Sequence, residues 1–360
     1  MRFPTWTKTR LALALIGLAI PFSSCGRGST SSSSHNSYLT VPQSNHVVGL
    51  HINDKSGGLS AVSGSPFTTG NSPSGIAVAP SKQFVYVANS NDNNISVFKV
   101  DSGNGSLSEV MPRTNAGTNP VAVATDSTGS FLFAANQGSN TVSVFAITSG
   151  GKLSEVANSP FAVGSGPARL LATPAGFLYV ANTNSLSVSQ FSITPGTGFL
   201  MSIAAPVVLS QAPLDLALDP AGHFVYAALS AGFTGFSVDQ ASGRLSEITV
   251  TPFTAGTSPG SLAVSPSGQF LYVANLGSNN VSVFSLDPAT GQPTQITNSP
   301  FTAGTRPAFV TIDPSGGFVY TGNQASKSIS ILKVNTDTGG LGAGTTFATE
   351  NAAANMVIPK

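Results

Sequence analysis

The sequence predicts an all-β fold, a seven-bladed β-propeller made of four-stranded antiparallel blades. Three observations predict it: a unit that recurs every 46 to 48 residues, short apolar runs inside each unit, and incomplete units at the two ends. Self-similarity at this period is typical of propellers and other repeat architectures. The unit is marked by prolines that each open a similar phrase, namely Pro73, Pro120, Pro167, Pro213, Pro259 and Pro307.

Each unit contains four short apolar runs that are separated by turn residues. In the first complete unit they are the run after Pro73, the run FVYVAN from Phe84, the run ISVF from Ile95, and a weaker run from Leu107. The runs alternate with period two and are rich in Val, Ile, Phe and Tyr, which favours strands. Because no unit has room for a helix of about ten residues, each is expected to form one four-stranded blade.

The two ends of the chain together supply the seventh blade. Residues 38–67 contain only the later strands of a unit, and residues 347–358 contain only its beginning, with Ala353 at the place of the proline. Pairing the C-terminal strand with the N-terminal blade would complete that blade and remove the free edges of an open array. The sequence therefore predicts a propeller over residues 38–360 whose ring is closed by its last strand.

The chain carries few charges. Lys, Arg, Asp and Glu make up 8% of it and the formal net charge is +1, whereas about 25% of an average soluble protein is charged. Binding of nucleic acid requires clustered Lys and Arg to neutralise phosphates, and the sequence has no such cluster. We therefore expect no nucleic-acid partner, and we expect a monomer.

Residues 1–24 are typical of a signal peptide. Arg2, Lys8 and Arg10 form a basic start, residues 11–22 are an apolar stretch too short to span a bilayer, and small residues precede Cys25. The segment resembles a bacterial lipoprotein signal, which implies that Cys25 carries a lipid. The protein would then be exported and held in the bacterial cell envelope by that anchor alone. An ordinary secretory signal with an incidental cysteine is the alternative.

Residues 25–37 follow the predicted signal and have a different composition. They are rich in serine and lack large apolar residues, which is typical of a flexible linker. We expect this segment to be a tether between the lipidated cysteine and the propeller.

The repeated phrases resemble those of a known family. The strand motif YVAN at residues 86–89, 179–182 and 272–275, the turn P-S-G-x-F and the strand VSVF are similar to motifs of the seven-bladed propeller lactonases. The resemblance, which includes related YVTN-type repeats, extends over nearly all of residues 38–360. It implies that the protein hydrolyses a lactone, which in the best-known members is 6-phosphogluconolactone. Such repeats also occur in surface-layer and adhesion-like proteins. The alternative function is therefore that of a noncatalytic propeller that binds a ligand, polymer or partner protein.

The sequence departs from these lactonases at one position. They often carry a histidine directly after the repeat proline, and no blade has one here. That column reads Ser74, Val121, Ala168, Leu214, Gly260 and Ala308. A phosphorylated sugar lactone is also a cytoplasmic metabolite, so an exported hydrolase of this type is expected to use an unphosphorylated lactone.

The second position after each proline is expected to ring the mouth of the central channel, because the first strand of a blade is the innermost. This column reads Gly75, Ala122, Arg169, Asp215, Ser261, Phe309 and, in the seventh blade, Asn355. Its uncharged polar members, Ser261 and Asn355, are candidate ligand-binding residues.

Two pairs of opposite charge are expected near this mouth. Arg169 and Asp215 come from adjacent blades, and Arg306 and Glu350 lie in the loops that enter blades six and seven. Lactone hydrolysis needs a base for water and a donor for the oxyanion. Asp215 or Glu350 could be the base, and Arg169 or Arg306 the donor. The alternative is that each pair is a salt bridge between neighbouring blades.

Other polar residues give weaker signals. No Cys, His and carboxylate side chains stand at metal-ligand spacing, so we expect no cofactor and no metal, although calcium on backbone carbonyls in the channel stays open. A recurring asparagine at the end of the second strand, such as Asn89, is expected to hydrogen-bond turn backbone. His223 lies in a turn on the opposite face, where we expect it to be exposed.

Overall fold

A computed structural model of the protein describes residues 34–248 and 252–359. The predicted signal peptide and Cys25 lie outside the described residues. The regular secondary structure of the described chain is β-strand apart from one short 3-10 helix, η1 (Pro42–Ser44). No helix in these two ranges is long and apolar enough to cross a membrane.

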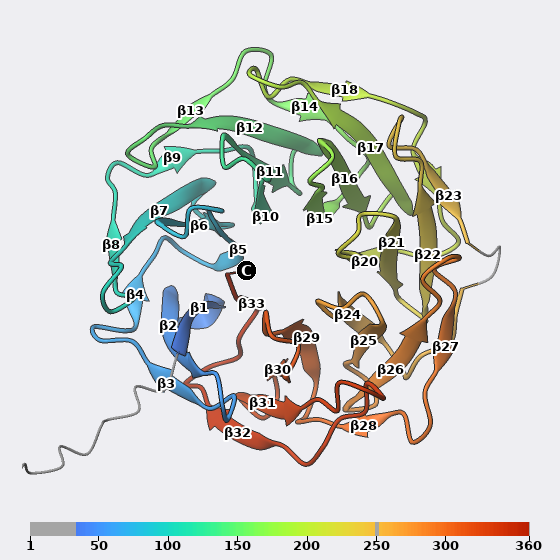
Figure 1. The fold of residues 1–360 in the computed structure, drawn as a ribbon. Helices are drawn as coiled ribbons and strands as arrows, with labels where there is room; N and C mark the ends of the chain where they lie inside the picture. Colours follow the sequence, from blue (N-terminus) through green and yellow to red (C-terminus); the bar gives the residue numbers. More distant parts are fainter. Residues whose placement is uncertain (1–33, 249–251, 360) are drawn as a thin grey trace, which may run out of the picture. The chain divides into compact units, whose positions relative to one another are not determined.

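Seven antiparallel sheets surround a central axis, as the sequence predicts (Figure 1). Each sheet is one blade, and we number the blades from the one that begins with Pro73. In blades one to six the strands follow chain order from the axis outwards. The innermost strands are β5 (Pro73–Val78), β10 (Pro120–Thr125), β15 (Pro167–Ala172), β20 (Pro213–Leu218), β24 (Pro259–Val264) and β29 (Pro307–Ile312).

The second strand of each blade is the most deeply buried. All six residues of this strand are buried in each of blades one to six, because the neighbouring blades cover both of its faces; this explains the unbroken apolar runs of the FVYVAN type. These strands are β6 (Phe84–Asn89), β11 (Phe131–Asn136), β16 (Phe177–Asn182), β21 (Phe224–Leu229), β25 (Phe270–Asn275) and β30 (Phe318–Asn323).

The third and fourth strands form the outer half of each blade. The third strands are β7 (Asn94–Val100), β12 (Thr141–Ile147), β17 (Ser187–Ile193), β22 (Phe233–Val238), β26 (Asn280–Leu286) and β31 (Ser328–Lys333). The fourth strands are β8 (Leu107–Glu109), β13 (Leu153–Glu155), β18 (Leu200–Ser202), β23 (Leu245–Glu247), β27 (Pro293–Gln295) and β32 (Thr345–Ala348).

Five sheets carry an additional strand of two residues, which pairs with the third strand of the sheet, as the fourth strand does. These are β4 (Phe67–Thr68), β9 (Thr114–Asn115), β14 (Phe161–Ala162), β19 (Val207–Val208) and β28 (Phe301–Thr302). Each opens a unit of the sequence but pairs with the third strand of the preceding blade, as β9 does with β7. The sequence unit therefore spans the boundary between two blades.

Blade seven joins the two ends of the chain, which confirms the predicted closure (Figure 1). It consists of β33 (Asn355–Val357), β1 (Ser34–Val41), β2 (His46–Asn53) and β3 (Leu59–Ala61). Strand β33 pairs with β1 through three residue pairs, including Leu39 with Met356. Ala353, at the place of the proline, is 2% exposed.

Strand β1 begins earlier than the sequence indicates. Residues 34–37 were expected in the tether, but Ser34 pairs with Asn53 and Ser37 with Leu50 in strand β2. The innermost strand β33 covers only residues 38–40 of β1. Residues 34–37 of β1 can therefore be polar, because their place in the sheet depends on backbone pairing with β2 and not on an apolar pattern.

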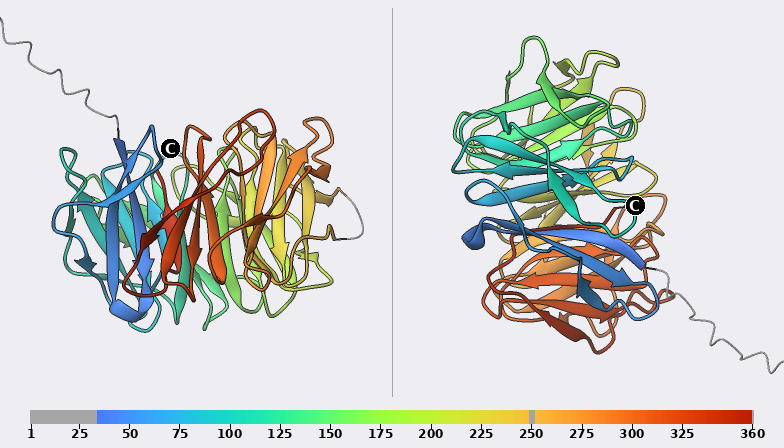
Figure 2. Two further views of the ribbon diagram at one scale, coloured as in Figure 1. Left: turned by 90° about the horizontal axis from the view of Figure 1, so that it is seen from below. Right: turned by 90° about the vertical axis from the view of Figure 1, so that its left-hand side faces the viewer.

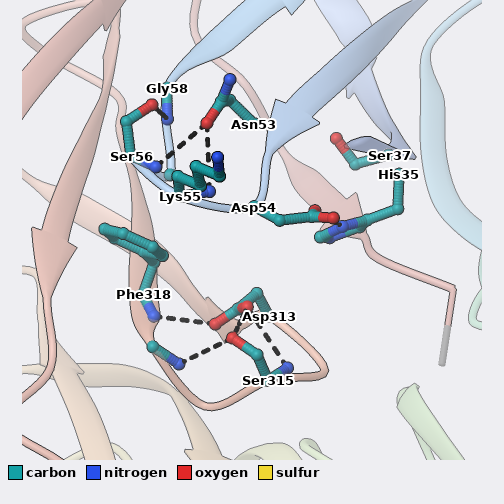
Figure 3. A network of polar contacts seen from close by, with 12 residues as sticks. His35, Ser37, Asn53, Asp54, Lys55, Ser56, Gly58, Asp313, Ser315 and Phe318 are labelled. Carbon is teal, nitrogen blue, oxygen red and sulfur yellow. Dashed lines mark hydrogen bonds and ion pairs between the residues drawn. The ribbon is translucent and has the colours of Figure 1, made fainter. Parts of the chain in front are cut away.

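The turn between β2 and β3 lies beside a turn of blade six (Figure 3). The hydroxyl of Tyr320 donates to the carbonyl of Gly57 at 3.0 Å, and the ring of Phe318 occupies the space that a side chain on Gly57 would need. Asp313 holds the adjoining turn of blade six by accepting the Phe318 N–H at 2.7 Å. His35 Nδ1 lies 2.6 Å from Asp54 Oδ1 at the same end of blade seven.

The blades have two ends, which Figure 2 shows from the side. The innermost strands begin at one end with their prolines, and we call this end the mouth face. Because neighbouring strands are antiparallel, the second strands finish at the mouth face with residues such as Asn89. The turns between first and second strands and between third and fourth strands lie on the opposite face.

Candidate functional site

The innermost strands enclose a cavity of about 180 Å³. The residue two positions after each proline lines it in all seven blades: Gly75, Ala122, Arg169, Asp215, Ser261, Phe309 and Asn355. The structure thus brings four of the six nominated catalytic and ligand-binding residues to one place. Arg306 and Glu350 do not line this cavity.

A β-bulge directs this column toward the axis. In blades two to six the register of the first and second strands shifts between the proline and the second residue after it, as between Pro167 and Arg169. The residue directly after the proline is left unpaired, and such a bulge re-aims the side chains beside it. The column directly after the proline is the one in which the lactonases often carry a histidine and this chain has none.

Arg169 and Asp215 form an ion pair between blades three and four. Arg169 Nε lies 3.4 Å from Asp215 Oδ1, and the two side chains are 33% and 16% exposed. Asp215 also accepts two backbone N–H groups, from Leu216 at 3.0 Å and from Leu262 of blade five at 3.1 Å. Since a carboxylate has about four acceptor positions, one remains for water or a ligand.

The guanidinium of Arg169 keeps donors for a ligand. Its Nη1 donates to the carbonyl of Ala168 at 3.0 Å, and Nε faces Asp215. Nη2 has no acceptor in the described part of the chain, although the side chain lines the cavity. A planar guanidinium held on one side in this way can donate to a carbonyl or carboxylate oxygen of a bound molecule.

Ser261 and Asn355 differ in how much of their side chains is free. Ser261 Oγ accepts the N–H of Val310 in blade six at 3.2 Å, and Ser261 is 4% exposed. Ser261 therefore links blades five and six, in the same way as Asp215 links blades four and five. The amide of Asn355 has no hydrogen-bond partner within residues 34–248 and 252–359 and is half-buried at the cavity, so it is available to a ligand.

The second expected charge pair does not form. Arg306 and Glu350 are both exposed and make no ion pair within the described ranges. Arg306 has a φ of 58°, and its N–H donates to Asn279 Oδ1 at 2.8 Å, so the backbone is fixed while the side chain lies in solvent. Glu350 instead lines a separate hollow at the seam of blades six and seven, together with His46.

The cavity has an apolar side at blades six, one and two. Phe309 is 4% exposed and packs in the core between blades six and seven. A side chain on Gly75 would stand 2.6 Å from the Cα of Ala122, so the first strands of blades one and two approach closely. Arg169, Asp215 and Ser261 therefore lie together on blades three to five, whereas Asn355 of blade seven stands apart, between Phe309 and Gly75.

The recurring asparagine has a structural role; in blade two it bonds turn backbone as expected, since Asn136 Oδ1 accepts the N–H of Gly117 at 3.1 Å, and it also bonds side chains of the third strand. Asn89 Nδ2 donates to Asn94 Oδ1 at 2.8 Å and to Ser96 Oγ at 3.0 Å, both in the third strand of its own blade. The corresponding asparagines repeat this pair of bonds with residues five and seven positions later. His223 is exposed on the opposite face, as expected.

Metal-binding groups do not gather in the structure. Within residues 34–248 and 252–359 there is no set of three or more His, Cys, Asp or Glu side chains that could hold a metal ion. The described chemistry of the axial cavity is therefore that of Arg169, Asp215, Ser261 and Asn355.

The fold is a seven-bladed propeller with a cavity on its axis. The sequence matches the model of a family described as lactonase, 7-bladed beta-propeller, in three overlapping segments, residues 30–168, 157–253 and 229–357. The chain belongs to this family. A search of curated protein sequences finds no match.

Solved structures of the same architecture cover the propeller almost completely. A protein of Bacteroides uniformis, provisionally assigned as a 6-phosphogluconolactonase, is 21% identical with a TM-score of 0.80, over 90% of this chain and 99% of the other. The periplasmic gluconolactonase of Pseudomonas aeruginosa is 19% identical with a TM-score of 0.78, over 91% and 99%. At such identities the similarity establishes the fold alone.

Proposed function

We propose that the protein hydrolyses a lactone bound in the axial cavity. The observation that carries this proposal is the Arg169–Asp215 pair, which lines the cavity with a guanidinium donor and one open carboxylate position. Membership of the lactonase family supports the same reaction class.

In this mechanism Asp215 orients a water molecule and accepts its proton as the oxygen attacks the lactone carbonyl. Arg169 donates to the oxyanion that develops on the carbonyl oxygen. The ring C–O bond then breaks, and the proton passes to the leaving alkoxide, which gives the hydroxy acid. In this proposal the amide of Asn355 bonds a ring hydroxyl.

The charge of the cavity favours an unphosphorylated substrate. Arg169 is its one lining cation among the described residues, and Asp215 neutralises it. A phosphate monoester carries about −1.5 to −2 charge at neutral pH, which this cavity would leave uncompensated. The P. aeruginosa structure named a periplasmic gluconolactonase offers a precedent for an exported propeller of this fold acting on such a lactone.

We also propose that the protein is exported and anchored in the bacterial cell envelope by a lipid on Cys25. The support is the sequence alone, a basic start, a short apolar stretch and a single cysteine after small residues. The anchor would leave the propeller in an aqueous compartment outside the cytoplasm, where unphosphorylated sugar lactones are the relevant substrates.

The assay that tests the function uses the full chain in detergent with a panel of lactones, read as acid release. We expect hydrolysis of an uncharged six-carbon sugar lactone well above the spontaneous rate, and weaker activity on its 6-phosphate. Faster hydrolysis of the phosphorylated lactone would contradict the substrate class. Acid release no faster than the spontaneous rate for every lactone of the panel would contradict the reaction.

A second function, ligand binding without catalysis, is favoured by two observations. Three of about four acceptor positions on Asp215 are already filled, and no imidazole lines the cavity. A binder of this kind would bind the lactone or its hydroxy acid saturably in calorimetry while acid release stays at the spontaneous rate.

A further inference from the structure

Blade three differs from the other blades in the character of its outer edge. Five large apolar side chains are exposed among the described residues, and four of them belong to this blade: Leu186 at 36%, Phe199 at 38%, Met201 at 55% and Val208 at 78%. Phe199 directly precedes the outermost strand β18, Met201 lies in it, and Val208 lies in β19, which continues that edge. Leu186 lies in the turn between β16 and β17 of the same blade. Such a concentration on one of seven similar blades is not the scattered exposure of an ordinary surface.

The same blade has lost the charges that protect a sheet edge. Residues 170–214 contain no Lys, Arg, Asp or Glu. The outermost strands of blades one, two and four end in a glutamate, as β13 does at Glu155, whereas β18 ends in Ser202. Met201 occupies the register position at which those strands have serine. Charges on edge strands normally prevent association through the edge.

Some other edges also lack charge, but they do not share the apolar residues. Strands β27, β32 and β3 carry no charged side chain, and none of the large exposed apolar residues belongs to them. Thr294 of β27 occupies the position of Met201. Blade three therefore combines an unprotected edge with apolar side chains that water solvates poorly.

We propose that the outer edge of blade three is a contact surface between two copies of this chain. An edge strand leaves backbone N–H and C=O groups without strand partners, and a second strand satisfies them where a lipid surface cannot. An uncharged apolar edge is complementary to itself, and antiparallel pairing of one edge with its copy is two-fold symmetric, so each residue is used twice. This departs from the monomer expected from the sequence.

The size of the edge sets the strength of the contact. Strand β18 has three residues and β19 has two, so the paired area falls at the low end of specific interfaces, below about 1,200 Å². We therefore expect a reversible dimer that depends on concentration, in which the axial cavities of both copies stay open because β18 lies at the rim of the ring and β15 at its centre (Figure 1).

Sedimentation equilibrium of the full chain, in density-matched detergent and over about a hundredfold range of concentration, tests this contact. The wild type is expected to pass from monomer to dimer. Met201→Glu should raise the dimer dissociation constant at least about tenfold, a change of about 1.4 kcal/mol. Thr294→Glu, which places the same charge at the same position of blade five, should leave the dissociation constant unchanged.

Met201→Ser introduces the serine of blades one, two and four without adding charge, and it should also weaken the dimer while the circular dichroism spectrum stays that of the wild type. A wild type that is monomeric at every concentration would overturn the proposal. So would a dimer that Thr294→Glu weakens as much as Met201→Glu, because the contact would then not lie on blade three.

Discussion

The ring of Phe309 occupies the space that a side chain on Gly322 would need. The two residues are paired across the first and second strands of blade six. Blades one to five have alanine at the position of Gly322, namely Ala88, Ala135, Ala181, Ala228 and Ala274, and none of them has an aromatic residue at the position of Phe309. Blade six therefore accommodates its large cavity residue by omitting one methyl group from the second strand.

This relationship predicts that Gly322→Ala destabilises the protein by about 1 to 3 kcal/mol, because an extra methyl group in a packed core forces neighbouring side chains out of place. Phe309→Ser, which gives blade six the residue of blade five, should make the alanine harmless. Urea denaturation of the two single variants and the double variant measures the coupling. Equal losses from Gly322→Ala in the presence and absence of Phe309 would show that the ring and the methyl group do not compete.

Tyrosine hydroxyls join five of the seven blade boundaries, and each donates to a glycine carbonyl in a turn of the next blade. The pairs are Tyr38 with Gly105 at 3.0 Å, Tyr179 with Gly243 at 2.7 Å, Tyr226 with Gly291 at 2.7 Å, Tyr272 with Gly339 at 3.2 Å and Tyr320 with Gly57 at 3.0 Å.

The hydroxyl of Tyr86 is buried and has no such partner. The facing turn is one residue shorter: Gly151 donates to Thr148, three residues before it, whereas Gly105 donates to Asp101, four residues before it. The expected carbonyl is therefore out of place at this one boundary.

We predict that Tyr86→Phe leaves the free energy of unfolding unchanged or raises it, because a buried unpaired hydroxyl costs about 1 to 3 kcal/mol. The matched control Tyr226→Phe should lower it by about 1 kcal/mol, since it removes a formed hydrogen bond and leaves the Gly291 carbonyl unpaired. Thermal unfolding followed by circular dichroism compares the two variants. Equal destabilisation by both would mean that Tyr86 has a partner in solution.

The buried tyrosines also predict how stability changes at high pH. Burial raises the pKa of Tyr38 to about 12, and it raises the pKa of the other five tyrosines further. The folded chain therefore holds these phenols neutral while the unfolded chain ionises them near pH 10. Their contribution to stability is fully present below about pH 10 and falls as the pH rises toward the folded pKa values.

An alkaline titration read by phenolate absorbance and circular dichroism checks this expectation. The phenolate signal of all the tyrosines should appear in one step, together with the loss of β-structure. Gradual ionisation of the tyrosines near pH 10 with the β-structure intact would contradict the burial of their hydroxyls.

The anchor is tested by Cys25→Ser. The variant should fail to incorporate labelled fatty acid in a bacterial host and should leave the membrane fraction, because no other cysteine exists in the chain. A matched change of a serine in the Ser-rich segment, such as Ser31→Ala, should alter neither property. A Cys25→Ser variant that stays as membrane-bound as the wild type would remove the lipid anchor from the account.

Most of the fold could be predicted from the sequence, because every blade repeats the same pattern of strands and turns. Spacing of the prolines placed the first strands, and the partial units at the ends placed the closure of the ring by β33. The start of β1 at Ser34 could not be read from composition, since backbone pairing with β2 defines it and the residues are polar. Likewise, the assignment of Phe67–Thr68 to the preceding blade depends on pairing with β2.

The sequence predicted where the candidate site lies and which residues line it, but not the contacts that their side chains make. The column after each proline gave the lining residues of the cavity, because periodicity fixes which residues face the axis. It could not show that Asp215 bonds the N–H of Leu262 across a blade boundary, nor that Arg306 and Glu350 stay apart, because both depend on where side chains point within loops. The Phe309–Gly322 pair was detectable by comparing the strand YTGN with YVAN.

The most direct test of the account is the rate of acid release from an uncharged sugar lactone by Arg169→Ala, beside the wild type and Arg306→Ala. Arg169 lines the axial cavity and Arg306 is exposed outside it. We predict that Arg169→Ala lowers kcat by about 10²- to 10³-fold, the usual loss for an oxyanion donor, while Arg306→Ala keeps the wild-type rate. Wild-type turnover by a folded Arg169→Ala variant would contradict catalysis in this cavity.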